Sequence, residues 1–170
     1  FVRSSKDIEQ LQTLIKSRDK HARVVAKIEK PEAVADIDEI IQATDAVMIA
    51  RGDLGVEVPM QDVPLIQKDI ISKCLSSGKP VIVATQMMES MIESATPTRA
   101  EVNDVANAVL DGADAVMLSA ETSVGKHPIV AVDAMTKIIQ SMEAGNKKIF
   151  NERPPYNPED KRFITDSVCY

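Results

Sequence analysis

Tryptophan is absent from this sequence, and aromatic residues make up only 3% of its 170 positions. A hydrophobic core must therefore be built from aliphatic side chains and eight methionines. The sequence has no cluster of basic residues, and its net charge at pH 7 is −6, so nucleic acid is not an expected partner. This composition favours an α/β protein over a β-sandwich or an aromatic peptide-binding module.

Cysteine is scarce as well, and long apolar runs are missing. The two cysteines, Cys74 and Cys169, fit no metal-binding spacing and do not suggest a disulfide scaffold. We expect two reduced thiols in a cytoplasmic protein. No stretch approaches the roughly 18 apolar residues of a membrane span, so no membrane association is expected. No signal peptide is recognisable at the start, which is Phe1 rather than Met.

Short apolar runs alternate with longer segments that have helical periodicity. Strands whose residues are apolar at consecutive positions are typical of a parallel sheet. Right-handed crossovers then place the carboxyl ends of all strands at one edge. The predicted strands are 24–28, 46–50, 81–84 and 115–118, and the predicted helices begin near Ser5, Pro31, Val63, Thr98 and Pro128.

Units of nearly uniform length predict an arc of a (β/α)8 barrel, with a flat, doubly wound sheet as the alternative. We assign residues 1–150 to this α/β domain. The segment 151–160 contains three prolines and predicts a linker. Residues 163–170 resemble the beginning of a further element.

Some local features are also expected. Residues 1–3 resemble the end of a strand, and residues 31–41 a single helix. Thr98 and Glu101 have the spacing of a capping box at a helix start. Residues 52–55 predict a turn. Three methionines are expected to pack under a loop rather than bind a ligand: Met87, Met88 and Met91.

Polar side chains follow each predicted strand at the point where it ends. In parallel α/β folds this edge is where ligands bind, because its loops are not needed for the core. Four successive strands show the pattern, which makes accident a poor explanation. The residues are Lys27 and Glu29, Arg51 and Asp53, Thr85 and Gln86, and Ser119 and Glu121.

Two of these residues predict a metal site. Glu29 and Asp53 follow neighbouring strands about 5 Å apart, so both carboxylates can reach one Mg²⁺ ion. A site with only two protein carboxylates leaves coordination positions open for substrate oxygens. The alternative is that these acids form structural salt bridges with Lys27, Lys30 or Arg51.

Other strand-end residues have the chemistry of an anion site. Lys27 is embedded in its strand, although a lysine that reaches out to solvent is the alternative. Gly52 and Gly55 flank Asp53 and allow the backbone to approach a ligand closely. Thr85 offers a hydroxyl group at the same edge, or simply caps a turn.

The sequence resembles the pyruvate kinase family along its whole length. Five motifs occur in the family's order and spacing, and together they make a chance match negligible. They are Ala26-Lys27-Ile28-Glu29, Ala50-Arg51-Gly52-Asp53-Leu54-Gly55, Ala84-Thr85-Gln86-Met87, Pro97-Thr98-Arg99-Ala100-Glu101 and Leu118-Ser119-Ala120-Glu121-Thr122.

The resemblance implies transfer of a phosphoryl group from phosphoenolpyruvate to ADP, giving pyruvate and ATP. It implies that Glu29 and Asp53 hold Mg²⁺ or Mn²⁺ and that Lys27 stabilises charge on the phosphoryl group. The backbone at Gly52 and Asp53 would bind the substrate carboxylate. Thr85 would help to deliver the proton that converts enolate to ketone.

Further implications concern the surroundings of the site. The family also uses K⁺, whose site would lie outside this chain, and it forms homo-oligomers, typically tetramers. Arg99 lies in a region used for subunit contacts. Lys126 is a candidate for nucleotide binding, although it stands two positions later than in the animal pattern. The expected supporting residues are Arg51, Gln86, Ser119 and Glu121.

By the resemblance, the chain covers the end of barrel strand 4 through helix 8, the second half of the barrel, with residues 151–170 leading toward a further domain. Alone it is expected to be inactive, and its open sheet edges would favour self-association or domain swapping. Two alternatives stay open: a metal-dependent aldolase or lyase acting on a pyruvate enolate, and a non-catalytic half-barrel that serves as an assembly unit.

Overall fold

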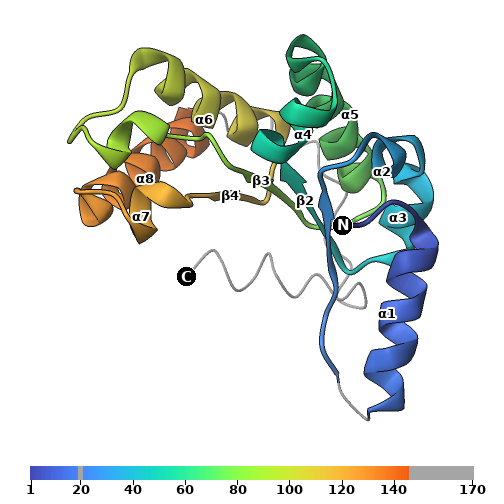
Figure 1. The fold of residues 1–170 in the computed structure, drawn as a ribbon. Helices are drawn as coiled ribbons and strands as arrows, with labels where there is room; N and C mark the ends of the chain where they lie inside the picture. The colour runs from blue at the N-terminus through green and yellow to red at the C-terminus, as the bar shows by residue number, and fades with distance from the viewer. Residues whose placement is uncertain (19–20, 146–170) are drawn as a thin grey trace.

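A computed structural model describes residues 1–18 and 21–145, which form a parallel sheet with helices packed beside it (Figure 1). The sheet has four strands in the order β1-β2-β3-β4. All three neighbouring pairs are parallel, as predicted. The strands are β1 (Val25–Ile28), β2 (Ala46–Ala50), β3 (Val81–Ala84) and β4 (Ala115–Met117).

The register of the strands brings their carboxyl ends to one level. Ile28 pairs with Ile49, and Ile49 with Val83. Ala50 pairs with Ala84, so β2 and β3 end side by side. The residues that follow each strand therefore emerge along one edge of the sheet.

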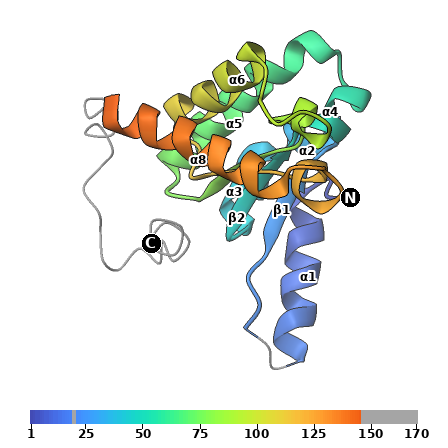
Figure 2. The same cartoon turned by 90° about the vertical axis from the view of Figure 1, so that its left-hand side faces the viewer.

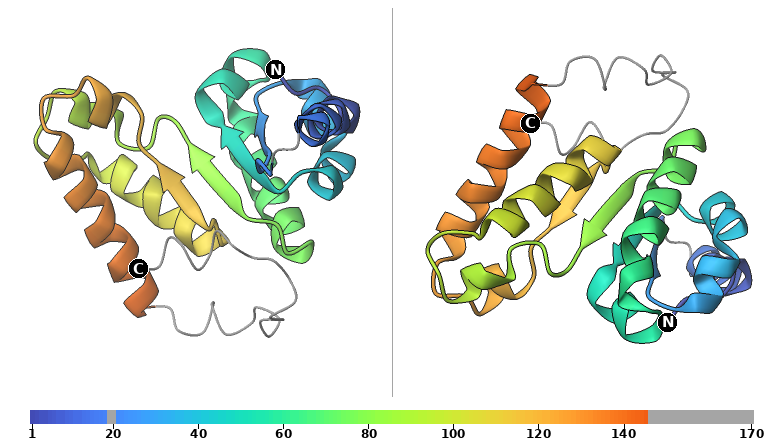
Figure 3. Two further views of the ribbon diagram at one scale, coloured as in Figure 1. Left: turned by 90° about the horizontal axis from the view of Figure 1, so that it is seen from below. Right: turned by 90° about the horizontal axis from the view of Figure 1, so that it is seen from above.

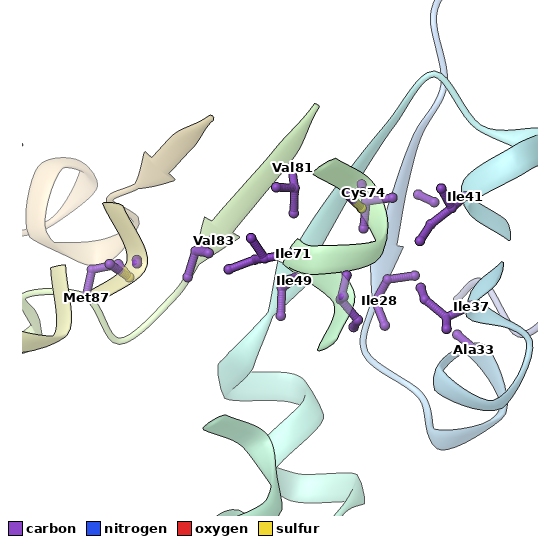
Figure 4. Packing of buried hydrophobic residues seen from close by; sticks show 14 of the residues in the cluster. Ile28, Ala33, Ile37, Ile41, Ile49, Ile71, Cys74, Val81, Val83 and Met87 are labelled. Carbon is purple, nitrogen blue, oxygen red and sulfur yellow. The ribbon is translucent and has the colours of Figure 1, made fainter. Parts of the chain in front are cut away.

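One face of the sheet is buried against helices. Ile28, Ile49 and Val83 occupy paired positions on β1, β2 and β3 and are fully buried. Figure 4 shows these side chains with Ile71 and Cys74, which come from the helix Val63–Ser76 (α5). Aliphatic side chains thus supply this core, as the composition predicted.

The main helices follow one another in a row. Successive members of the row are in contact, and α5 also packs on β2 and β3 (Figures 2 and 3). The row consists of α1 (Ser5–Ser17), α3 (Ile37–Ala43), α5, α6 (Arg99–Asp111) and α8 (Pro128–Gly145). α5, which connects β2 to β3, packs on both of these strands, and α6 contacts β4, as in (β/α) barrel units.

The sheet is an open arc rather than a closed barrel. Within residues 1–18 and 21–145, β1 and β4 each have a strand neighbour on one side only. The predicted strand end at residues 1–3 is wrong, because these residues pair with no strand. No helix in the described part of the chain is both long and apolar enough to cross a membrane. The predicted linker and further element at 151–170 lie outside the described residues.

The single helix predicted for residues 31–41 is also wrong. The structure has α2 (Pro31–Ala35) and α3, separated at Asp36, whose φ of −101° and ψ of 19° leave the helical region. The Asp36 carboxylate accepts a hydrogen bond from the backbone N–H of Ser5 at 2.8 Å. The break therefore allows Asp36 to connect this segment to the start of α1.

The turn predicted at residues 52–55 is a short helix instead, α4 (Arg51–Glu57). The chain passes from β2 into α4 without an intervening loop. Leu54 is fully buried, and its carbonyl accepts a hydrogen bond from Val58 N–H at 2.9 Å. Burial of Leu54 explains why helix is favoured over an exposed turn despite the two glycines.

The capping box at the start of α6 is confirmed. Glu101 N–H donates to Thr98 Oγ1 at 3.2 Å, and Thr98 N–H donates to the Glu101 carboxylate at 2.7 Å. Glu101 also accepts from the N–H and hydroxyl of Ser90, in the short helix η2 (Glu89–Ile92). Glu101 thus connects η2 to α6. As expected for packing residues, three methionines nearby are fully buried: Met87, Met88 and Met91.

The remaining short elements are η1 (Met60–Asp62) and α7 (Ala120–Ser123). Gly112 follows α6 with a φ of 98°, in the left-handed region that favours glycine. A Cβ at this position would lie 2.8 Å from Leu75 Cδ1. The end of α6 is thereby placed closely against α5.

We predict that Glu101→Gln makes the fold less sensitive to acid. Burial acts to raise the pKa of Glu101, but hydrogen bonds from Ser90 and Thr98 outweigh it and hold the pKa below the usual 4.5. The stability from the carboxylate is therefore present above pH 4.5 and lost as the pH falls through the lower folded pKa. The variant should lose about 1 kcal/mol at neutral pH and a smaller further amount in acid, as urea unfolding would measure.

The matched control is Glu9→Gln, on the exposed face of α1. It should change the free energy of unfolding by less than about 0.5 kcal/mol. An acid dependence of Glu101→Gln equal to that of wild type would contradict the assigned role.

Candidate active site

Three predicted site residues meet at the carboxyl edge of the sheet. Lys27 Nζ lies 2.5 Å from Glu29 Oε2 and 2.7 Å from Asp53 Oδ2. Lys27 occupies a β1 position that points away from the buried face, since Ala26 and Ile28 on either side are buried. Asp53 is in the first turn of α4, where the helix dipole favours negative charge.

The three side chains differ in exposure, and their opposite charges are in contact. The Glu29 side chain is 10% exposed, whereas Lys27 is 46% and Asp53 56% exposed. The Lys27 ammonium, with a smaller contribution from the Phe1 amino group, lowers the pKa of Glu29 to about 2. Asp53 and then Glu29 raise the pKa of Lys27. Lys27 and Glu29 are therefore both charged at neutral pH.

The carboxylates of Glu29 and Asp53 fit a metal site in which the protein supplies only a few of the ligands. Both already contact one cationic group, the Lys27 ammonium, so their oxygens converge on a common position. Within the described ranges, no group of three or more acidic, histidine or cysteine side chains could enclose a metal ion. A divalent cation here would take most of its ligands from substrate and water, as Mg²⁺ commonly does. The alternative interpretation, a salt bridge with Lys27, is what this structure contains.

Thr85 and Gln86 follow β3 in an unusual conformation. Their φ angles are 68° and 54°, and no other non-glycine residue in the described ranges has a positive φ. This conformation is costly, above all for a β-branched residue such as Thr85. The Thr85 hydroxyl accepts from Gly52 N–H at 2.7 Å and donates to the Ala84 carbonyl at 2.6 Å. Thr85 is therefore in direct contact with the start of α4.

The Arg51 side chain binds the backbone of the Thr85–Gln86 segment. Its side chain is 10% exposed, and its Nη2 donates to the carbonyls of Thr85 at 2.9 Å and Gln86 at 3.0 Å. Its Nη1 donates to Asp104 Oδ1 at 2.7 Å. Asp104, on α6, is absent from the sequence-based predictions. One feature of the sequence could have indicated Asp104: it lies four positions before the buried Ala108, so both residues are on the same face of the helix.

Glu121 joins two loops at this edge. It is 3% exposed, and its carboxylate accepts from the backbone N–H of Ser119 at 2.8 Å and of Met88 at 3.1 Å. The segments that follow β3 and β4 are therefore connected through Glu121. Ser119 and Glu121, the two residues predicted after β4, both lie at the carboxyl edge of the sheet. The Glu121 oxygens accept hydrogen bonds from backbone N–H groups.

Lys126 is held by a different group. Its ammonium forms an ion pair with Glu93, and its backbone N–H donates to the Ile92 carbonyl at 2.8 Å. The Lys126 side chain is 65% exposed. The structure thus places Lys126 beside η2, while its role in nucleotide binding stays a prediction.

A pocket of about 290 Å³ lies beside α4. Its wall includes Arg51, Gly52 and Gln86, but not Lys27 or Glu29, so it borders the charged group rather than containing it. The other lining residues are Gly55, Val56, Met60, Val63, Pro64 and Asp104.

Comparisons with known proteins agree on one family. A family model described as "Pyruvate kinase, barrel domain" matches residues 1–132. A pyruvate kinase of Mycobacterium tuberculosis is 57% identical over 166 residues, and that of Geobacillus stearothermophilus is 48% identical over 171. A crystal structure of a pyruvate kinase from Cryptosporidium parvum matches with a TM-score of 0.85 and 40% identity.

The matches cover nearly all of this chain and a minor part of the relatives. They include 96% of the chain for the Mycobacterium protein, 99% for the Geobacillus protein and 92% for the Cryptosporidium structure. The corresponding shares of those proteins are 34%, 29% and 34%. The chain therefore spans about a third of the length of the relatives it matches.

We predict that Lys27→Met raises the pKa of Glu29 from about 2 toward its usual 4.5, because Lys27 is the main cause of the lowered value. Side-chain carboxyl signals followed by NMR during a pH titration would measure the change. Lys68→Met, which removes a partner of Asp111 elsewhere on the surface, is the control. An unchanged Glu29 titration in Lys27→Met would contradict the assigned pairing.

Proposed function

This chain belongs to the pyruvate kinase family, and from that premise we propose that it forms the second half of the catalytic barrel of a glycolytic phosphotransferase. The whole protein would transfer the phosphoryl group of phosphoenolpyruvate to ADP. Residues 1–150 would belong to the barrel, and residues 151–170 would lead to a further domain. The observation that carries the proposal is the contact of Lys27 with both Glu29 and Asp53 at the carboxyl edge of the parallel sheet.

Glu29 and Asp53 are the proposed ligands of Mg²⁺ or Mn²⁺. The bound ion would neutralise charge on enolate and phosphoryl oxygens. Glu29 is well suited to this role because it stays ionised far below neutral pH. Asp53 is more than half exposed, so its carboxylate is accessible to an arriving ion.

Lys27 is proposed to stabilise the transferring phosphoryl group. Its half-exposed side chain is flexible enough to turn from the carboxylates toward phosphoryl oxygens. A positive charge held at that point acts on the charge that develops during transfer, the step in which positioning and electrostatics dominate catalysis.

Thr85 and the start of α4 are proposed to handle the rest of the substrate. The first N–H groups of a helix have no partner within the helix, so those of Gly52 and Asp53 are suited to a carboxylate. The Gly52 N–H donates to the Thr85 hydroxyl in this structure and would exchange that partner for the substrate carboxylate. The Thr85 hydroxyl would pass a proton from solvent to the methylene carbon of the enolate, which yields the ketone. Its contact with Gly52 N–H supports this placement beside the substrate carboxylate.

The remaining proposals rest on family membership. K⁺ would bind outside this chain, ADP would be bound partly by segments absent from it, and Lys126 is the candidate nucleotide contact here. The whole protein would be a cytoplasmic homo-oligomer, with Arg99 near a subunit contact. The aldolase and assembly-unit alternatives gain no support from the relatives compared above, each of which is named pyruvate kinase.

Activity and metal binding can be tested separately. The whole protein should form ATP from phosphoenolpyruvate and ADP with Mg²⁺ and K⁺, whereas the 170-residue chain alone should form none. Aldol cleavage without ATP formation would instead favour the alternative enzyme, and turnover by the chain alone would contradict the half-barrel account.

We predict that Asp53→Asn weakens Mn²⁺ binding to the whole protein by at least about 10-fold, because one of two protein carboxylates is lost. Calorimetric titration would measure the affinity. The matched control is Asp62→Asn, in exposed η1 a short distance along the chain, which should bind Mn²⁺ like wild type. Equal affinity in Asp53→Asn and wild type would exclude Asp53 as a ligand.

A further inference from the structure

We propose that Asp104 is a positioning residue that, through Arg51, holds the left-handed Thr85–Gln86 segment so that the Thr85 hydroxyl faces the reacting carbon. This inference rests on the proposed function, because it assigns to Asp104 a part in the proton step of that reaction. Asp104 lies on α6 and reaches the edge of the sheet only through the Arg51 guanidinium.

The segment needs external support. Thr85 and Gln86 are consecutive non-glycine residues with positive φ, and such strained conformations persist only where surrounding contacts determine them. Threonine is especially unfavourable here because its branched Cβ crowds the backbone. Without such support, the backbone at Thr85 would relax and the hydroxyl would turn away from Gly52.

The Arg51 guanidinium supplies that support. Nε and Nη2 both donate to the Thr85 carbonyl, at 3.2 and 2.9 Å, and Nη2 also donates to the Gln86 carbonyl at 3.0 Å. One planar group therefore binds the carbonyls of both strained residues. A lysine could not reproduce this, because an ammonium lacks the fixed geometry of several donors.

Asp104 in turn fixes the guanidinium. Its Oδ1 accepts from Nη1 at 2.7 Å, and its Oδ2 lies 2.7 Å from Nη2, so both carboxylate oxygens face the guanidinium. The Gln67 side chain, in α5, adds a longer contact with Nη1 at 3.4 Å. Since the Arg51 side chain is only 10% exposed, the Asp104 carboxylate is also its main compensating charge.

Thr85 is thus held by contacts to two of its groups. Its carbonyl is held by Arg51, and its hydroxyl by Gly52 N–H and the Ala84 carbonyl. Gly52 itself permits the approach, because a Cβ there would lie 3.2 Å from Thr85 Oγ1. A shift of the carbonyl would therefore move the hydroxyl relative to α4, where the substrate carboxylate is proposed to bind.

The test uses the whole protein with pyruvate, Mg²⁺ and ATP in D₂O. Enolisation breaks a methyl C–H bond, releases the proton to solvent and returns a deuteron to the same carbon, so NMR follows the proton step directly. We expect Asp104→Asn to slow this exchange about 10- to 100-fold, since small displacements of a catalytic group have effects of that size. The KM for phosphoenolpyruvate should change less than about twofold, because substrate binding does not use Asp104.

A double-mutant cycle separates positioning from general damage. In a Thr85→Val background, Asp104→Asn should slow exchange little further, because the group through which it acts is gone. Asp111→Asn removes an ion-paired aspartate from the same helix and should leave exchange and KM unchanged. The backbone NMR shifts of Thr85 and Gln86 should move in Asp104→Asn and not in Asp111→Asn.

Arg51→Lys provides a second variant should Asp104→Asn fail to fold, because it keeps the charge beside Asp104 and removes the bridge to the two carbonyls. The Arg51→Lys variant should slow the exchange of the pyruvate methyl protons by a similar factor. Wild-type exchange in Asp104→Asn, or in Arg51→Lys if only that variant folds, would overturn the inference, as would full additivity with Thr85→Val. Absence of both exchange and ATP formation in wild type would instead overturn the proposed function itself.

Discussion

Parallel pairing in register is the constraint from which the rest of this structure follows. Because β2 and β3 end at paired alanines, the residues after them leave the sheet at one level. Lys27, one position before the end of β1, points along the same edge toward Asp53. Groups separated by up to 58 positions in the sequence, from Lys27 to Thr85, are thereby gathered without any long loop.

A second layer of polar contacts converts this edge into a defined arrangement. Glu121 joins the segments after β3 and β4, Arg51 binds the backbone after β3, and Asp104 connects it to α6. Each of these contacts includes either a charged side chain with little exposure or a backbone group that fixes the direction of the hydrogen bond. The charges cost desolvation, and their hydrogen bonds offset it. These contacts connect the segments that lie beside the more exposed Lys27 and Asp53.

Much of this could be predicted from the sequence, because the decisive signals are local. Four apolar runs separated by segments of helical periodicity predicted the strands, and the capping box at Thr98 predicted the start of α6. The errors arose where tertiary contacts override local preference: Asp36 breaks a helix to reach Ser5, and burial of Leu54 turns a glycine-rich turn into α4. Asp104 was missed for the same reason, since its partner Arg51 is 53 residues away. The metal and catalytic roles of Glu29, Asp53, Lys27 and Thr85 stay predictions.

We propose that Glu29, Asp53 and Thr85 surround one ligand position at the carboxyl edge of the sheet. Paramagnetic broadening by Mn²⁺, observed by NMR on the whole protein, tests it most directly because broadening falls steeply with distance from the ion. The signals of these three residues should broaden, while those of Val25 and Val81, at the opposite ends of β1 and β3, should stay sharp. Broadening centred on Val25 or Val81, or absent from all five residues, would contradict it.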